Sequence, residues 1–442
     1  MKCLIIAAGK GSRLQSKFDC KPLIPVLGTP LIERVIRSAM EAGAYDFYVV
    51  VGYAGERVRK FLNSLSDRLG IPITVIPNED WKKENGWSVL KAKEYLKEPF
   101  YLLMADHLFE PDIIRRLEGY RLKEGEIVLG VDENLENGLI DMDDVTRVEF
   151  DEEKINGIGK NLENFNGFDT GIFRCTPALF QAIEHSSASE NNTTLSGAVQ
   201  MLAHENSARI VSIGDNFWID VDDPKAFRKA ENVLLKKLRT EKHNDGPVAR
   251  YLNRPLSIAM SRFLVRTRIT PNQISIFSFF VSLVGAGLFF IGGRNQLILG
   301  GFLAQFASVV DGCDGEVARL KFQSSQYGAW LDAVLDRYAD AFLLFGLTWY
   351  EFQAKANENI LWIGFLAIIG SFMLSYSADK FDNMMKNRID KFGGIRIGRD
   401  IRIFLIFLGA LFNQITITLV IIAAVMNVET LRRLVICRDN DE

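Results

Sequence analysis

The stretch that decides the fold reads Asp311-Gly312-Cys313-Asp314-Gly315-Glu316-Val317-Ala318-Arg319 and, after a polar turn, continues with Gly328, Asp332 and Asp336. It joins the end of one apolar segment to the start of the next. If both segments are helices, the first two aspartates share one face and the last two share another, because residues three or four apart are helical neighbours. Converging carboxylates in an apolar setting repel one another and need cations, so the stretch predicts a Mg²⁺ or Mn²⁺ site. The alternative is a solvated acidic loop, but acidic residues within membrane-length apolar segments are usually functional.

The fixed positions of this stretch resemble the signature of the CDP-alcohol phosphotransferase family. That family's enzymes sit in membranes and displace CMP from a CDP-alcohol by the hydroxyl of a second alcohol. The resemblance implies that Asp336 is both a metal ligand and the general base for that hydroxyl, and that Gly315 and Arg319 contact the nucleotide. The metal ligands that it implies are Asp311, Asp314, Asp332 and Asp336.

Composition divides the chain into two unlike parts. A length of 442 residues favours two or three domains, and although 48% of all residues are hydrophobic, residues 1–245 look soluble and residues 270–436 look membranous. The net charge of −3 provides no basic field for nucleic acid. The five cysteines show no C-x-x-C spacing, which speaks against a disulfide framework or zinc site and for a reducing compartment. No secretory signal opens the chain, so we expect the first part to be cytoplasmic.

We therefore predict a soluble domain at 1–240, a linker with an interfacial amphipathic helix at 241–269, and a membrane domain at 270–442. Residues 248–268 mix apolar side chains with five arginines, a composition typical of a helix lying in an anionic interface. A surface helix packed on the soluble domain is the alternative. Thr270-Pro271-Asn272 then reads as a cap before the first membrane span.

The soluble domain opens with a strand-like run, Leu4–Ala8, followed by the glycine loop Gly9-Lys10-Gly11-Ser12-Arg13-Leu14. A strand, a glycine loop and a helix together present backbone N–H groups to phosphates. Lys21-Pro22-Leu23 follows, so Arg13 and Lys21 can both reach a triphosphate. This opening resembles that of the sugar-phosphate nucleotidyltransferases, and the resemblance implies that Gly9, Gly11, Arg13 and Lys21 bind the nucleotide, the last two as catalytic residues. It is not a Walker loop, because no Gly-Lys-Ser/Thr closes it.

Strand-like and helix-like stretches alternate after this opening. Residues 47–51 and 73–76 read as strands, with helices at 31–42 and 56–69, which predicts a doubly wound α/β sheet. A further strand near Tyr101 ends at Asp106, and open α/β sheets bind ligands where their strands end.

The nucleotidyltransferase resemblance implies the remaining residues of the first site. Asp106 and Asp220 would hold one Mg²⁺ against the CTP phosphates. Asn85 and Ser88, which precede a helix expected at 89–96, would line the nucleotide pocket; an ordinary turn with a serine N-cap is the alternative. Lys160 would hold the phosphate of the second substrate or is a solvated surface lysine, and Asp169 would accept a polyol hydroxyl. His107 we interpret as a structural residue.

Six apolar segments predict six membrane spans in an all-α domain, at about 273–292, 296–318, 328–350, 358–377, 401–412 and 415–431. Basic residues crowd the connection between the fourth and fifth segments and follow the sixth, which places those loops and the aspartate cluster on the cytoplasmic side. Arg399 and Arg402 would bind a substrate phosphate bidentately, although any cytoplasmic loop collects arginines. The basic residues of the connection are Lys380, Lys386, Arg388, Lys391, Arg396, Arg399 and Arg402.

Together the two resemblances cover nearly the whole chain and match the bifunctional inositol-1-phosphate cytidylyltransferase/di-myo-inositol phosphate phosphate synthase family. They imply CTP and inositol 1-phosphate as substrates, CDP-inositol as the intermediate, Mg²⁺ or Mn²⁺ as cofactor, a lipid bilayer, and a homodimer formed through the membrane domain. Two alternatives stay open: a phospholipid synthase with a lipid acceptor, and a non-catalytic N-terminal nucleotide sensor. The residues alone do not distinguish inositol from another polyol.

Overall fold

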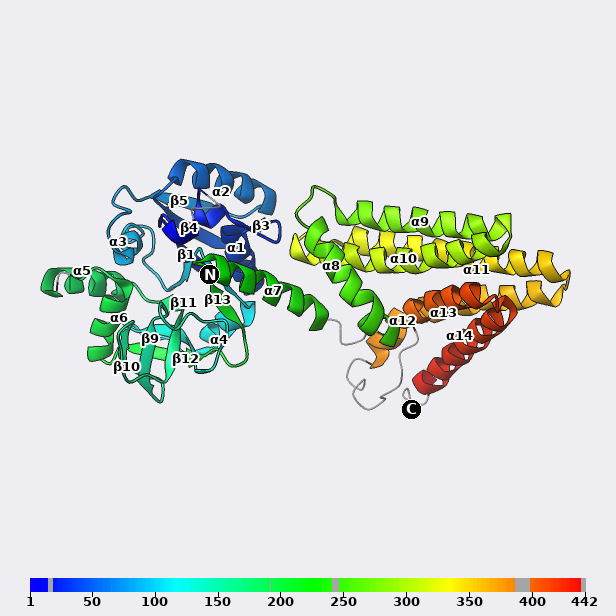
Figure 1. Ribbon diagram of the computed structural model, residues 1–442. Coiled ribbons are helices and arrows are strands. Elements are labelled where there is room, and N and C mark those ends of the chain that lie inside the picture. Colours follow the sequence, from blue (N-terminus) through cyan, green and yellow to red (C-terminus); the bar gives the residue numbers. More distant parts are fainter. Residues whose placement is uncertain (15–18, 191, 241–245, 386–397, 439–442) are drawn as a thin grey trace. The chain divides into compact units, whose positions relative to one another are not determined.

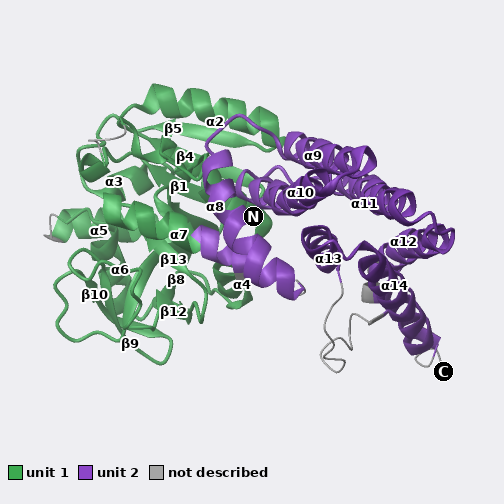
Figure 2. Cartoon of the chain, turned by 45° about the vertical axis from the view of Figure 1, so that its right-hand side comes forward, with its two compact units in different colours: residues 1–233 green, residues 234–442 purple. Residues whose placement is uncertain are grey.

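The computed structural model describes residues 1–14, 19–190, 192–240, 246–385 and 398–438 (Figure 1). The chain divides into two compact units, Met1–Val233 and Leu234–Glu442, coloured green and purple in Figure 2. The two units correspond to the soluble and membrane halves expected from the sequence. The finer boundaries at residues 240 and 269 stay predictions.

The first unit is built on a nine-stranded mixed sheet with the order β5-β4-β1-β6-β11-β8-β12-β10-β9. β1, β4, β5 and β6 run parallel, whereas β11 runs antiparallel to both of its neighbours β6 and β8. The strands of this sheet are β1 (Lys2–Ala7), β4 (Asp46–Val51), β5 (Ile73–Pro77), β6 (Phe100–Met104), β8 (Ile127–Asp132), β9 (Arg147–Asp151), β10 (Lys154–Gly159), β11 (Gly167–Cys175) and β12 (Ala208–Ser212). Two short pairs accompany it: β2 (Pro25–Val26) with β3 (Thr29–Pro30), and β7 (His107–Phe109) with β13 (Trp218–Asp220).

Helices cover both faces of this sheet, because alternate strand residues point to opposite faces and both sets are apolar. On β1, Cys3 and Ile5 belong to one buried cluster and Leu4 to the other. The first cluster includes α1 (Leu31–Glu41), α2 (Gly55–Leu69) and α4 (Pro111–Gly119). The second includes α3 (Asn85–Leu90), α5 (Ala178–Glu190) and α6 (Leu195–His204). The expected α/β doubly wound class is therefore confirmed, with antiparallel strands added.

Two local predictions in this unit are wrong. The glycine loop is followed by a short 3₁₀ turn, Ser12–Leu14, where the sequence led us to expect a helix, and residues 15–18 lie outside the described residues. The helix expected at 89–96 instead begins at Asn85 and ends at Leu90. Contacts distant in sequence fix its start: the Gly86 N–H donates to the Thr193 carbonyl at 3.0 Å, and Glu84 accepts hydrogen bonds from Thr193.

The second unit contains helices in the six places where apolar segments predict them. They are α9 (Pro271–Ile291), α10 (Arg294–Leu320), α11 (Gln326–Lys355), α12 (Asn359–Met385), α13 (Arg399–Phe412) and α14 (Ile415–Arg438). α9 begins with the expected cap: Thr270 and Gln273 form a reciprocal capping box, and Pro271 occupies the first turn. Figure 1 shows α9, α10 and α11 lying side by side.

Three of these helices are long and apolar enough to cross a membrane: Pro271–Ile291, Arg294–Leu320 and the Asn359–Ala378 part of α12. Of the other three helices, α13 has only 14 residues. The structure thus supports a membrane domain, and the count of six spans stays a prediction.

A helical segment precedes α9, as the sequence predicts. It consists of a π-helical turn (Ala249–Asn253) and α8 (Arg254–Leu264). Arg254 is buried and donates to the fully buried Glu316 of α10 at 2.8 Å, and Ser257 donates to the same carboxylate oxygen at 2.6 Å. One side of α8 is thereby fixed to α10, while Tyr251, Leu256 and Phe263 remain exposed. A membrane-interface role for this exposed side stays a prediction.

Candidate active sites

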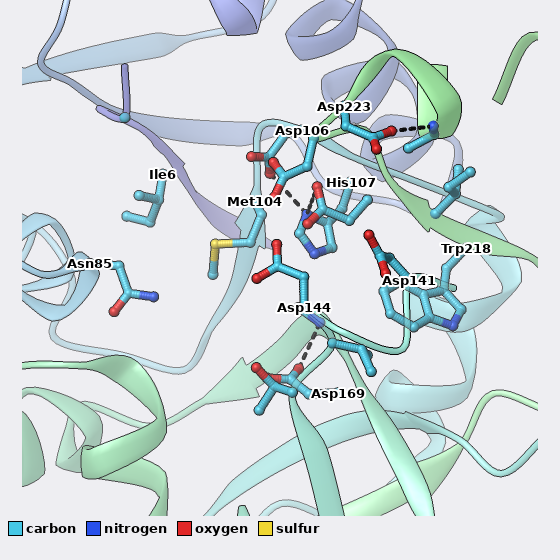
Figure 3. Close-up of a pocket in the computed structure, with 18 of the residues that line it drawn as sticks. Ile6, Asn85, Met104, Asp106, His107, Asp141, Asp144, Asp169, Trp218 and Asp223 are labelled. Atoms are coloured by element: carbon cyan, nitrogen blue, oxygen red, sulfur yellow. Dashed lines mark hydrogen bonds and ion pairs between the residues drawn. The ribbon is translucent and has the colours of Figure 1, made fainter. Parts of the chain in front are cut away.

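The first unit contains a cavity of about 810 Å³ at the carboxyl ends of its parallel strands. Most of the residues predicted for the first site line it: Gly9, Arg13, Asn85, Ser88, Asp106, Lys160, Asp169 and Asp220. Figure 3 shows Asp106, His107, Asp144 and Asp169 gathered in this cavity, with Asn85 standing apart from them. Strands and loops from the whole length of the unit therefore contribute to one site.

Lys21 and three aspartates form a charged centre at this cavity; the aspartates line the cavity, whereas Lys21 is buried and does not. The Lys21 ammonium donates to Asp106 at 2.6 Å and to Asp222, and lies 3.8 Å from Asp220. The pairing of β7 with β13 sets Asp220 opposite His107, next to Asp106. Burial lowers the pKa of Lys21, but the carboxylates of Asp106 and Asp220 outweigh burial and raise it. Lys21 therefore stays charged and balances part of the negative charge of this centre.

His107 also belongs to this centre, although the sequence led us to interpret it as structural. Its Nδ1 lies 2.9 Å from Asp106 Oδ1 and 3.8 Å from Asp220 Oδ1. Burial lowers the pKa of His107, but Asp220 and Asp106 outweigh burial and raise it to about 9. Its ring stacks on Trp218 with centroids 6.0 Å apart, and Trp218 Nε1 donates to Asp132 at 2.9 Å. Asp106, His107 and Asp220 each offer a ligand atom, all within 4.8 Å of one another.

Asp144 forms ion pairs with both Arg13, predicted to bind the triphosphate, and Lys160, predicted to bind the phosphate of the second substrate. Arg13 donates to Asp144 Oδ2, and Lys160 donates to Asp144 Oδ1. Arg13 Nη1 also lies 3.5 Å from Asp222 Oδ2. Hydrogen bonds from Arg13 and Lys160 lower the pKa of Asp144 to about 2. The carboxylate is therefore ionised, and it lines the cavity.

Asp169 lies deeper in the same cavity, on β11. Its carboxylate accepts a hydrogen bond from the Gly171 N–H at 2.7 Å. Burial raises the pKa of Asp169 to about 6, and this backbone bond and the charge of His107 only partly oppose the shift. Gly171 has a φ of +71°, and a Cβ there would lie 2.9 Å from the His107 ring, so only glycine fits.

The glycine loop brings Lys21 into place. Gly11 has a φ of +63°, and a Cβ on it would lie 2.5 Å from Lys21 Cβ. Asn85 and Ser88 each use a side-chain oxygen within the protein: Asn85 accepts from the Leu195 N–H at 2.8 Å, and Ser88 accepts from Asn78 at 3.0 Å. Both nevertheless line the cavity, so a nucleotide contact by either residue stays a prediction.

In the second unit, helices α10 and α11 bring the predicted aspartates together. Asp311, Asp314 and Asp332 each offer a carboxylate oxygen, all within 4.8 Å of one another. Helix α9 contacts two of them: Ser278 donates to Asp311 at 3.1 Å and Ser275 donates to Asp314. Asp332 Oδ1 is buried and has no hydrogen-bond partner among the described residues. A cavity of about 320 Å³ adjoins this cluster, lined also by Asp336, Arg399, Arg254 and Ser257.

Asp336 and the two predicted phosphate-binding arginines form a connected ion-pair network. Arg399 Nη1 lies 2.8 Å from both Asp311 and Asp336, and its Nε donates to Asp340 at 3.2 Å. Arg402 is 2% exposed and donates to Asp340 at 2.6 Å and to the Ser371 carbonyl at 3.3 Å. Arg399 therefore faces the cavity, whereas Arg402 lies among the helices. Gly315 and Arg319 lie together, with Arg319 Nη1 3.3 Å from the position of a Cβ on Gly315.

The sequence did not single out four functional candidates: Asp144, Asp340, Ser275 and Ser278. Asp340 lies one helical turn after Asp336, so the four-residue spacing of Asp332 and Asp336 continues to it. Ser275 and Ser278 repeat the three-residue spacing of Asp311 and Asp314. Asp144 carries no such local signal. The basic positions Lys386, Arg388, Lys391 and Arg396 lie outside the described residues.

Comparison with known proteins accounts for both units. The family description "MobA-like NTP transferase domain" matches residues 3–140, and "CDP-alcohol phosphatidyltransferase" matches residues 268–431. A protein of Rubrobacter xylanophilus named bifunctional IPC transferase and DIPP synthase is 34% identical over 97% of this chain and 95% of its own length. The chain belongs to this bifunctional family. The family confirms the predicted fusion of a nucleotidyltransferase with a CDP-alcohol phosphotransferase.

Two further relatives each resemble one unit. An archaetidylinositol phosphate synthase of Pyrococcus horikoshii is 32% identical over 37% of this chain and 81% of its own length. The solved structure of the inositol-1-phosphate CTP transferase from T. maritima is 27% identical and covers 52% of this chain and 94% of that protein, with a TM-score of 0.47.

Proposed function

We propose that the chain catalyses two consecutive reactions: synthesis of CDP-inositol from CTP and inositol 1-phosphate, then transfer of phospho-inositol to a second inositol 1-phosphate. The observation that carries this proposal is the presence of two separate cavities in a chain aligned over 97% of its length with a bifunctional relative. Each cavity contains an aspartate cluster. The product of the second reaction would be di-myo-inositol phosphate phosphate.

In the first reaction, a phosphate oxygen of inositol 1-phosphate attacks the α-phosphorus of CTP. A new P–O bond forms, the bond to the bridging oxygen of the β-phosphate breaks, and pyrophosphate leaves. Arg13 and Lys21 bind the triphosphate and stabilise its developing charge, while Lys160 binds the phosphate of inositol 1-phosphate. Asp169, deep in the cavity, accepts hydrogen bonds from inositol hydroxyls.

The donor atoms of both clusters fit a hard divalent cation, which we propose to be Mg²⁺ or Mn²⁺. Each cluster has one buried carboxylate oxygen without a hydrogen-bond partner among the described residues, Asp220 Oδ1 and Asp332 Oδ1. A buried anionic oxygen without a hydrogen bond is costly unless a cation balances its charge; Asp220 Oδ1 has Lys21 and His107 3.8 Å away, and a bound metal would lie closer. Asp106 and Asp220 would hold the metal of the first site; Asp311, Asp314, Asp332 and Asp336 those of the second. Bound there, the metals neutralise phosphate charge and stabilise the leaving group.

In the second reaction, a hydroxyl of the acceptor inositol 1-phosphate attacks the phosphorus that carries inositol in CDP-inositol. The new P–O bond forms as the bond to the CMP phosphate oxygen breaks, and Asp336 takes the hydroxyl proton. Arg399, which faces the cavity, binds the acceptor phosphate. Gly315 lets the nucleotide approach α10, and Arg319 beside it neutralises a phosphate. Arg402 acts through Asp340 in our proposal, since its guanidinium lies among the helices.

We further propose that the second unit crosses the bilayer six times as a homodimer and that the first unit is cytoplasmic. Support for the bilayer comes from large apolar side chains on the outside of α9, such as Phe277, Phe280 and Val284. Support for the orientation comes from the basic residues after α12 and at the end of α14.

The two reactions are tested separately in the full-length protein by crossed variants. With CTP, Mg²⁺ and inositol 1-phosphate, Asp106→Asn should release no pyrophosphate, but it should release CMP when CDP-inositol is supplied. Asp336→Asn should release pyrophosphate and accumulate CDP-inositol. An unmutated protein that forms no CDP-inositol from CTP with any polyol phosphate would favour a nucleotide sensor. Mass spectrometry of the products identifies the polyol.

A lipid acceptor is the second candidate, because the membrane unit also resembles an archaetidylinositol phosphate synthase. The two candidates differ in the solubility of the product. Our proposal predicts that label from CDP-[³H]inositol stays in the aqueous phase when inositol 1-phosphate is the acceptor. Label in the chloroform phase, formed with a lipid alcohol and not with inositol 1-phosphate, would establish the phospholipid synthase instead.

A further inference from the structure

Helix α9 contributes no residue to the signature of the second site, yet it contacts two of the four aspartates. Three of its serines are buried, Ser275, Ser278 and Ser282, at 4%, 2% and 1% exposure. They are spaced by three and four residues and therefore share one helix face. Helix α10 packs closely against α9, so the serine hydroxyls of this face can reach side chains of α10.

Two of these hydroxyls match two aspartates one to one. Ser278 Oγ donates to Asp311 Oδ1 at 3.1 Å, and Ser275 Oγ donates to Asp314 Oδ2, with the Pro271 carbonyl of its own helix as a second, more distant acceptor at 3.3 Å. The serines are three residues apart on α9 and the aspartates three apart on α10, so adjacent helical turns meet in register. Ser282, one turn further along α9, has no hydrogen-bond partner for its hydroxyl among the described residues.

Each serine occupies only one oxygen of its aspartate. The other oxygen of Asp311, Oδ2, accepts from Arg399 at 2.8 Å, and the other oxygen of Asp314, Oδ1, accepts from the Gly315 N–H. A terminal carboxylate torsion is soft, so an aspartate without such donors rotates easily about its last bond. Donors on two sides hold each carboxylate plane in a defined direction. Asp332 Oδ1, which has no donor among the described residues, lies beside these two fixed groups.

We propose that Ser275 and Ser278 are positioning residues that orient the Asp311 and Asp314 carboxylates for divalent cation binding. The inference rests on the proposed metal site of the second unit. Groups that hydrogen-bond to metal-ligating carboxylates set ligand orientation, and their loss typically weakens metal binding by about 10- to 100-fold. The competing explanation is that small residues on α9 only allow close helix packing. Ser282 distinguishes the positioning role from the packing role. It is a small buried residue on the same face of α9, but its hydroxyl does not donate to any described aspartate.

The test measures metal binding directly, with Mn²⁺ as the probe. The full-length protein carries Asp106→Asn and Asp220→Asn throughout, so that the first site does not contribute, and free Mn²⁺ is followed by EPR during titration. Ser275→Ala and Ser278→Ala should each raise the dissociation constant for Mn²⁺ about tenfold. Ser282→Ala should leave it within twofold of the parent. Ser275→Thr, which keeps a hydroxyl at the same position, should restore binding to near the parent value.

Three results would overturn the inference: unchanged Mn²⁺ binding in both alanine variants at positions 275 and 278, an equal loss in Ser282→Ala, or a loss in Ser275→Ala that threonine does not restore. Unchanged binding in the alanine variants leaves the proposed function standing. A parent protein that binds no Mn²⁺ removes both the metal site and the inference. Circular dichroism shows whether each variant is folded. If Ser275→Ala is misfolded, Mn²⁺ binding by Ser275→Thr and Ser278→Ala decides the test.

Discussion

Replacing Asp144 by asparagine should strengthen substrate binding at the first site. In the structure this carboxylate neutralises both Arg13 and Lys160, which we assign to the triphosphate and to inositol 1-phosphate. Incoming phosphates must displace it from both cations. Asparagine keeps the size of the side chain and removes the competing charge. Lys160 then loses its ion pair, and Arg13 keeps the longer one to Asp222 at 3.5 Å, so phosphates displace less from both cations.

The expected size follows from the exposure of these groups. The side chains of Arg13, Lys160 and Asp144 are 56%, 58% and 23% exposed, so solvent screens both ion pairs. Exposed pairs contribute ~0.2–1 kcal/mol each. A value of ~0.7 kcal/mol corresponds to an affinity gain of about threefold. We therefore expect the KM values for CTP and for inositol 1-phosphate each to fall about threefold, with little change in kcat.

The assay is steady-state pyrophosphate release with each substrate varied in turn. Asp143→Asn is the matched control, because its carboxylate lines the same cavity and forms no ion pair with any described residue. KM values that rise in Asp144→Asn, or a kcat that falls more than tenfold, would show that Asp144 holds a substrate or metal directly. Equal effects in both variants would point to the general negative charge of the cavity.

Five further outcomes are expected. Because burial raises the pKa of Asp169 to about 6, its charged form appears as pH rises through that value; kcat/KM for inositol 1-phosphate should rise through pH 6, and Asp169→Asn should reduce this rise to the part that comes from ionisation of the substrate phosphate, whose pKa is also about 6. The same shift above the ordinary value should make the first unit less stable to urea as pH rises from about 4 to 6. Gly11→Ala places a Cβ against Lys21 and strains a left-handed residue by ~1–2 kcal/mol, so pyrophosphate release should fall at least tenfold while thermal melting shifts by only about 2–8 °C. Asp336→Asn should bind CDP-inositol normally in equilibrium dialysis and lose ~10²-fold or more in CMP release; near-normal release with acceptor would refute its role as base. Removing divalent metal with EDTA should stop both pyrophosphate and CMP release, and added Mg²⁺ should restore both.

Local patterns predicted those parts of the structure that depend on spacing along one element. The three- and four-residue intervals of Asp311, Asp314, Asp332 and Asp336 predicted their faces correctly, and the apolar segments predicted the six helices α9 to α14. Alternating strands and helices likewise predicted the α/β class. The predicted roles of individual residues are separate from this geometry and await the variants above.

Contacts between distant segments could not be predicted in this way. Asp144 meets Arg13 across 131 residues, and nothing near either residue signals the partner. The start of α3 depends on hydrogen bonds to Thr193, more than a hundred residues away. The sequence predicts Arg399 and Arg402 as ligands of a substrate phosphate, and nothing near either residue indicates their buried partner Asp340. Each of these features depends on tertiary packing, which a periodic pattern does not encode.

The close approach of Gly171 to His107 limits which substitutions this chain tolerates at the two positions. Gly171 is needed twice, once for its φ of +71° and once because a Cβ would lie 2.9 Å from the His107 ring. A smaller residue at position 107 removes the steric clash with a Cβ at position 171 but not the strain of a positive φ there. The harm done by alanine at position 171 therefore depends on the residue at position 107, and the two substitutions should be non-additive in a double-mutant cycle. An evolving lineage could thus replace the histidine first and the glycine second, whereas the reverse order would pass through an intermediate that bears both penalties.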